Sequence, residues 1–317
     1  MHSLNFNNLL FRLIGYLSIP VLILSASGCS RIEFAYRNAD WFLETYASRT
    51  VAASDEQIEQ WRPTLYRSLE YHRHELVPLI IDYLDLLARA IQIPGDTQLA
   101  PCIVDAGIYL YERHAEMAVD LATPLLATLD SAQISYLAET MAQEMESKRM
   151  DYLNTNLEVR HEERVERFIA RTERWTGKLN DRQREALEQA VRQIPDLSED
   201  WLDDQAQQTR LLLEILKNGA EEAQIRKRLT DWWVRLDQRP PEYVRNWLLA
   251  KRGFTEYLRL IGTSLTANQQ AKLLQKIAGL RQDFEAFQVP LQDPASPPDV
   301  FLCIDTATSG VLPRRQP

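Results

Sequence analysis

Five arginines recur at steps of four and three residues in the middle of the chain, at Arg160, Arg164, Arg167, Arg171 and Arg174. On an α-helix this spacing brings all five guanidinium groups onto one face, which we call the Arg stripe. Several glutamates lie among these arginines, so we favour a row of solvated or interhelical salt bridges. The alternative is a clamp for an anionic partner, such as a phosphorylated glycan, a lipid head group or an acidic protein, because guanidinium groups bind carboxylates and phosphates through paired N–H donors.

The nearest approach to a metal site is the run from His72 to Glu75. On a helix His72 and Glu75 share a face, whereas His74 points about 200° away from His72. Two ligands on one face do not complete a metal site. The sequence therefore predicts neither a metal nor another cofactor, and a polar pair between helices is the simpler interpretation.

No motif of nucleophilic or phosphate chemistry occurs in the sequence. It has no Gly-x-Ser-x-Gly elbow, no Gly-rich phosphate loop and no histidine set near a reactive cysteine. We therefore predict a protein that is not an enzyme.

The composition favours helices, since the 317 residues include only 10 glycines and are rich in Leu, Ala, Glu, Gln and Arg. We predict an all-α fold, an elongated multi-helix bundle. Residues 130–177 contain no proline and have a glycine only at their end, which predicts one helix of about 70 Å. This helix would be a central spine shared by two helical halves, residues 29–129 and 130–288. Residues 289–317 are Pro-rich and predict a disordered tail, in which Val300, Phe301 and Leu302 dock locally.

One local pattern occurs four times and predicts helix starts. Each copy has a short polar residue followed three positions later by glutamine: Ser54 and Gln57, Asp130 and Gln133, Asn180 and Gln183, Thr266 and Gln269. The short side chain caps free amides of the first turn, and the glutamine reaches back to the N–H of the cap.

The first 28 residues predict an export signal. They hold a single fixed charge, Arg12, and an apolar run from Leu13 to Leu24 that is too short to span a bilayer. Small residues then precede Cys29, and this order resembles the lipobox of bacterial lipoproteins. The resemblance implies that residues 1–28 are removed as a lipoprotein signal peptide and that Cys29 carries the lipid. An ordinary signal peptide and an uncleaved anchor are the alternatives.

The exported part is acidic. It carries 35 basic and 45 acidic residues, a net charge of −10, which excludes general affinity for nucleic acid and for anionic head groups. Membrane attachment would then depend on the Cys29 lipid. Two other cysteines remain, Cys102 and Cys303, and whether they pair in an oxidising compartment stays open.

Aromatic residues are dense immediately after Cys29. Residues 31–49 include Phe34, Tyr36, Trp41 and Tyr46. They predict a short helix that packs on the main body, with a helix lying on the membrane surface as the alternative.

Two families resemble this chain. Residues 36–41, 71–76 and 174–179, together with Gln183 and the lipobox, are similar to a family of uncharacterised proteobacterial lipoproteins. That resemblance implies an all-helical envelope protein, and Ser30 after Cys29 implies the periplasmic face of the outer membrane. Residues 265–269 are similar to the Leu-Thr-x-x-Gln repeats of small periplasmic chaperones. We expect a lipid-anchored, non-catalytic binding or scaffolding module with an envelope protein as a possible partner; the alternative is a chaperone-like client-binding protein of envelope stress.

Overall fold

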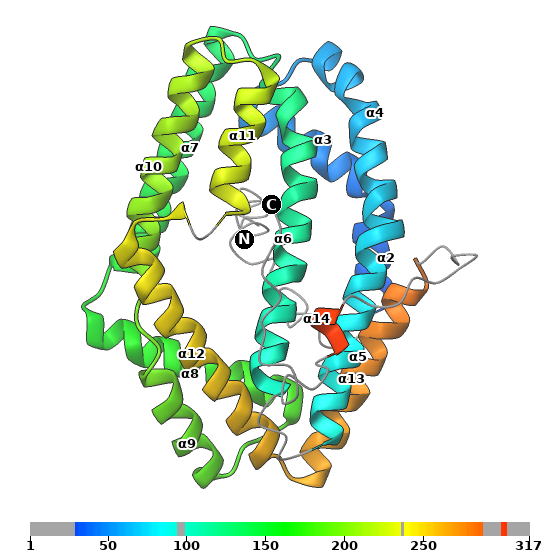
Figure 1. Ribbon diagram of the computed structural model, residues 1–317, viewed down its shortest axis with the longest axis vertical. Coiled ribbons are helices and arrows are strands. Elements are labelled where there is room, and N and C mark those ends of the chain that lie inside the picture. The colour runs from blue at the N-terminus through cyan, green and yellow to red at the C-terminus, as the bar shows by residue number, and fades with distance from the viewer. Residues whose placement is uncertain (1–28, 94–98, 236–237, 288–298, 303–317) are drawn as a thin grey trace, which may run out of the picture.

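The computed structural model describes residues 29–93, 99–235, 238–287 and 299–302 (Figure 1). Every regular element among them is a helix, so the predicted all-α multi-helix fold is confirmed. The predicted leader, residues 1–28, lies outside the described residues, as does most of the predicted tail. No helix in the described ranges is both long and apolar enough to span a membrane.

The helices follow one another with short connections. In chain order they are α2 (Cys29–Arg37), α3 (Ala39–Val51), α4 (Asp55–Tyr71), the π-helix η3 (His72–Leu76), α5 (Val77–Gln92), α6 (Leu99–Leu126), α7 (Ser131–Leu153), α8 (Leu157–Thr176), α9 (Asp181–Arg192), α10 (Ser198–Lys217), α11 (Glu222–Trp233), α12 (Pro241–Ser264), α13 (Ala267–Glu285) and α14 (Asp299–Leu302).

The predicted helix of 130–177 is wrong as a single helix, because the chain breaks at residues 154–156 between α7 and α8. The Asn156 side chain accepts the Val159 N–H at 3.1 Å and so begins a new helix. Asparagine favours such caps because its side chain competes for backbone groups. Absence of proline and glycine was therefore not sufficient for continuity.

The central position in the molecule belongs to α6 instead. It runs through the middle of Figure 1 and packs against α4, α5, α11, α12 and α14. The largest buried cluster joins helices of both predicted halves, with Trp61 of α4, Val119 of α6, Leu137 of α7 and Trp232 of α11.

The four predicted helix starts are confirmed, and each has a complete capping box. The box glutamines also pair across helices. Gln57 and Gln133 donate to each other's side-chain oxygen at 3.0 and 2.6 Å, and Gln183 and Gln269 do so at 2.8 and 3.1 Å. The first pair joins the starts of α4 and α7, and the second joins the starts of α9 and α13. In Figure 1 the starts of α4 and α7 lie near one end of the long axis, and the starts of α9 and α13 lie near the other.

A buried ion pair connects α10 to the segment between α11 and α12. Arg239 Nε lies 3.1 Å from Asp204 Oδ2, and both side chains are almost fully buried. Arg239 also donates to the carbonyl oxygens of Asp231 and Trp232, while Gln208 donates to Asp204 at 3.0 Å. This network fixes the α11–α12 connection against the bundle.

The docking predicted for the tail is confirmed for Val300 and Phe301 of the short helix α14. The side chain of Leu302 lies outside what the structure describes. Phe301 is buried between α5 and α6 with Leu86 and Ala106, and Arg89 donates to its carbonyl oxygen at 2.6 Å.

Cys102 of α6 is disulfide-bonded. Its Sγ atom lies 3.4 Å from the Val300 carbonyl oxygen. Cys303, which directly follows α14, lies outside the described residues. Because α14 brings the chain to Cys102, we expect Cys303 to be the partner.

We expect the wild-type protein to migrate faster on a non-reducing gel than on a reducing gel, because the Cys102 crosslink keeps the denatured chain compact. Cys303→Ser should abolish this difference, and Cys29→Ser should preserve it. A difference that survived in Cys303→Ser would assign the bond to another cysteine.

Candidate functional site

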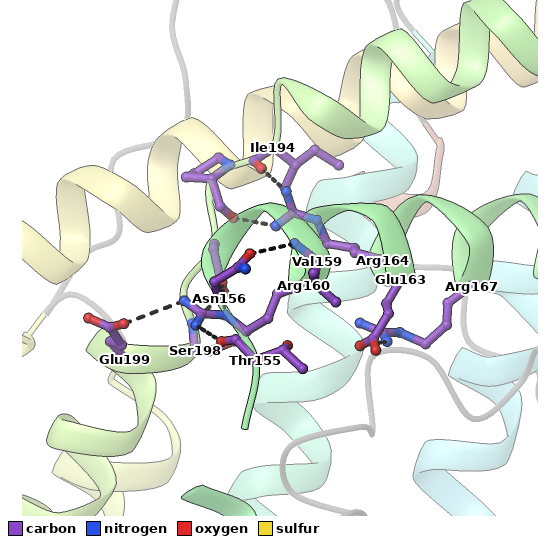
Figure 2. A network of polar contacts seen from close by, with 12 residues as sticks. Thr155, Asn156, Val159, Arg160, Glu163, Arg164, Arg167, Ile194, Ser198 and Glu199 are labelled. Atoms are coloured by element: carbon purple, nitrogen blue, oxygen red, sulfur yellow. Dashed lines mark hydrogen bonds and ion pairs between the residues drawn. The ribbon is translucent and has the colours of Figure 1, made fainter. Parts of the chain in front are cut away.

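The structure places all five residues of the Arg stripe on α8, as their spacing predicts. Arg160 and Arg164 point toward the connection between α9 and α10 (Figure 2). Arg160 Nε lies 2.8 Å from Asp196 Oδ2. Arg164 donates to the carbonyl oxygens of Ile194 at 2.5 Å and Pro195 at 2.9 Å. These two arginines therefore hold α8 against that connection.

The electrostatics of this contact agree with a structural role. Burial would raise the pKa of the Asp196 carboxyl, but hydrogen bonds from Ser198 and Arg160 bring it below its usual value. Burial lowers the pKa of the Arg164 guanidinium, which the nearby Asp196 partly offsets. Asp196 thus stays ionised beside its arginine.

The remaining three arginines differ in their partners. Arg167 lies 3.5 Å from Glu163 on the exposed side of α8, so salt bridging accounts for it. In the described part of the chain, Arg171 and Arg174 have neither an ion pair nor a side-chain hydrogen bond. Arg174 is exposed, whereas Arg171 is half-buried. The members of the Arg stripe therefore have different roles. Arg171 is the one that is half-buried and has neither an ion pair nor a side-chain hydrogen bond with a described residue.

Arg171 lines a cavity of about 220 Å³ between α5, α6, α8, α12 and α13, which we call the Arg171 cavity. Its walls are mostly apolar and include five aromatic rings: Tyr83, Phe168, Trp175, Phe254 and Tyr257. The Tyr257 hydroxyl is hydrogen-bonded to Thr172 and to the Phe168 carbonyl oxygen. Burial raises the pKa of Tyr257 to about 12, with a smaller opposing effect of Arg171.

Besides Arg171, Tyr83 is a polar wall residue without a hydrogen-bond partner among the described residues. Burial raises the pKa of its hydroxyl to about 12, and it makes no hydrogen bond with any described residue. Gly107 of α6 provides the room for this ring, because a Cβ atom there would lie 3.2 Å from the Tyr83 hydroxyl oxygen.

A second cavity, of about 500 Å³, is bounded by α2, α3, α4, α6, α7 and α11, and we call it the α3 cavity. Its few polar groups include a contact between the Tyr36 hydroxyl and His72 Nδ1 at 2.8 Å. The His72 and His114 rings lie 5.3 Å apart. Burial, aided by His114, lowers the pKa of His72 to about 3, so its imidazole is neutral at physiological pH.

The histidines of the run from His72 to Glu75 contact different partners. His72 bonds to Tyr36, while His74 Nε2 lies 3.3 Å from Glu70. His72 and His74 lie on the π-helix η3. In this helix the Val77 N–H donates to the His72 carbonyl oxygen, five residues earlier in the chain. Among the described residues no group of three or more His, Cys, Asp or Glu side chains could hold a metal ion.

Cys29 begins α2, and the placement of its side chain lies outside what the structure describes. Of the cavity walls, sequence reasoning identified Arg171 but missed Tyr83 and Gly107. No sequence signal marks these residues, because the walls combine helices that are far apart in the chain.

Comparison with known proteins gives one match. Residues 51–238 match a family of unknown function, DUF6279. The matched span contains α4 to α11, including the whole Arg stripe. No curated protein and no solved structure matches the chain.

Proposed function

We propose, from the premise that this chain belongs to the DUF6279 family of unknown function, that it is a cell-envelope lipoprotein whose helical body binds an apolar ligand without catalysing a reaction. The α3 cavity carries this proposal. Its volume of about 500 Å³ falls in the range of small-molecule sites, roughly 300–1,000 Å³. The neutral His72 and Tyr36 satisfy each other, so the walls favour a hydrocarbon ligand.

Attachment through a lipid on Cys29 would set the body close to the membrane. α2 begins at Cys29 and is followed directly by α3, which packs against α4 and α7. Phe34 and Trp41 on these two helices are 60% and 58% exposed. Exposed aromatic rings favour the membrane–water interface. The proposed location is the periplasmic face of the outer membrane, as implied by Ser30.

The alternative is a chaperone-like protein that binds unfolded clients, and exposed apolar residues such as Leu248 and Leu249 on α12 are consistent with it. The glutamines of the capping boxes are not available for clients, however, because they are occupied in the two amide pairs. We therefore prefer the binding module.

Cys29→Ser should release the protein from the membrane fraction and abolish incorporation of labelled palmitate, because the substitution removes the lipid-bearing thiol. Membrane fractionation of intact cells measures this result. Cys102→Ser serves as the matched control and should remain in the membrane fraction. Continued tight association of Cys29→Ser would contradict lipid anchoring and would favour an uncleaved leader.

A further inference from the structure

We propose that the Arg171 cavity binds a free fatty acid of medium chain length, with the carboxylate on Arg171 and the acyl chain among the aromatic walls. This inference rests on the proposed binding function and names a ligand class for the Arg171 cavity, in addition to the α3 cavity of the same body.

The size of the cavity limits the length of the chain. A dry cavity of about 150 Å³ accommodates benzene, which has six carbon atoms. In proportion, the volume of about 220 Å³ accommodates roughly nine non-hydrogen atoms. A chain of about eight carbons fills this space, and a much longer chain does not.

The walls match a hydrocarbon chain. Together with the aromatic rings of Phe168 and Phe254, the cavity is lined by the aliphatic side chains of Leu84, Leu87, Ile103 and Leu258. Such a lining makes the burial of each methylene group of a ligand favourable. The chain end of the ligand therefore has a suitable environment.

The charge of the cavity selects an anionic head. Arg171 has no acidic partner among the described residues. Arg259, the other arginine of the lining, is already paired with Glu256, with its Nε and Nη2 atoms at 2.7 and 2.5 Å from the carboxylate oxygens. Arg171 is thus the group that can pair with a carboxylate, and a guanidinium binds one through two parallel hydrogen bonds.

The Tyr83 hydroxyl adds a second polar contact. Tyr83 is half-buried, and its hydroxyl has no hydrogen-bond partner among the described residues. A ligand oxygen inside the cavity would supply one.

Calorimetric titration of sodium octanoate into the full-length Cys29→Ser protein tests the proposal without detergent. We expect saturable binding at one site. Affinity should rise with chain length up to about eight carbons and then fall, because the cavity is then filled. Affinity that rises steadily to hexadecanoate, as in non-specific partitioning, would overturn the proposal.

Matched variants identify the head contact. Arg171→Gln should weaken octanoate binding by roughly tenfold or more and leave the weaker binding of 1-octanol unchanged. Tyr83→Phe should weaken octanoate binding roughly threefold to tenfold. Arg174→Gln changes an exposed arginine of the same helix outside the cavity and should leave binding unchanged. Equal effects of Arg171→Gln and Arg174→Gln would contradict the assignment.

Two further experiments test which cavity binds octanoate and whether the natural ligand is a free fatty acid or a phospholipid. Ala90→Phe fills the wall of the Arg171 cavity and should abolish binding, whereas Ala118→Phe, in the α3 cavity, should not. Circular dichroism checks that both variants fold. Tighter binding of dioctanoyl phosphatidylglycerol than of octanoate would overturn the fatty acid in favour of a phospholipid. These titrations do not depend on the Cys29 lipid. The proposal of lipid anchoring and the proposal of fatty acid binding in the Arg171 cavity can therefore be contradicted independently of each other.

Discussion

Replacing Asp204 with alanine should lower the free energy of unfolding by about 3–5 kcal/mol, because it leaves the Arg239 charge without its acidic partner in the protein interior. Both side chains of the pair are almost fully buried. The substitution also removes the acceptor of Gln208 Nε2. Urea denaturation followed by circular dichroism measures the change as a lower midpoint.

Glu242→Ala is the matched control, because Glu242 forms an exposed pair with Arg245 at 2.9 Å. An exposed ion pair contributes about 0.2–1 kcal/mol, so this variant should unfold close to the wild type. If the two variants had the same midpoint, the Asp204–Arg239 pair would not be the contact that fixes the α11–α12 connection.

The second large effect is expected at the amide pairs. Gln183→Leu should destabilise the protein by about 2–4 kcal/mol, since it removes several buried hydrogen bonds, takes the Gln183 donor away from the Ser264 carbonyl, and leaves the Gln269 amide only its bonds to Lys178 and Thr266. Gln183 is only 4% exposed, and its amide donates to Ser264 at 2.7 Å and to Gln269 at 2.8 Å. Thermal and urea unfolding measure the loss.

A double-mutant cycle separates pairing from capping. The combined Gln183→Leu and Gln269→Leu variant should be less destabilised than the sum of the single variants, because neither amide is then left facing an absent partner. Gln57→Leu is the comparison, since Gln57 makes the same contacts in a half-buried setting. Additive effects, or equal losses at Gln57 and Gln183, would show that the helix caps alone account for the stability.

The local features of the fold were predictable from the sequence, because they depend on neighbouring residues. A capping box needs only a short polar residue and a glutamine three positions later, and all four predicted boxes are present. The pairing of their glutamines was not predictable, since Gln57 and Gln133 are 76 residues apart. The break at Asn156 was missed because asparagine is tolerated within helices as well as at their starts.

In the candidate site, too, the local features were predictable from the sequence and the contacts between distant residues were not. Spacing placed the Arg stripe on one helix, but the partners that join Arg160 and Arg164 to the α9–α10 connection and the start of α10 lie 30–39 residues further along the chain. Arg171 therefore could not be distinguished from its neighbours without tertiary structure. The cavities combine side chains from five or more helices, and no local pattern encodes such a space.

The docking of the chain's end has a consequence for folding kinetics. Helices α5 and α6 are synthesised early, yet their packing partners come late in the chain. Helix α13 packs against α5, and α14 packs against both α5 and α6. Arg89 of α5 donates a hydrogen bond to Phe301, 212 positions further along. Contacts of such high sequence separation form slowly, and a chain that emerges from its N-terminus exposes its early apolar faces until the later segments arrive. The native packing of α5 and α6 therefore cannot be completed before residue 302 has emerged, and until then Leu86 and Ala106 remain uncovered by Phe301.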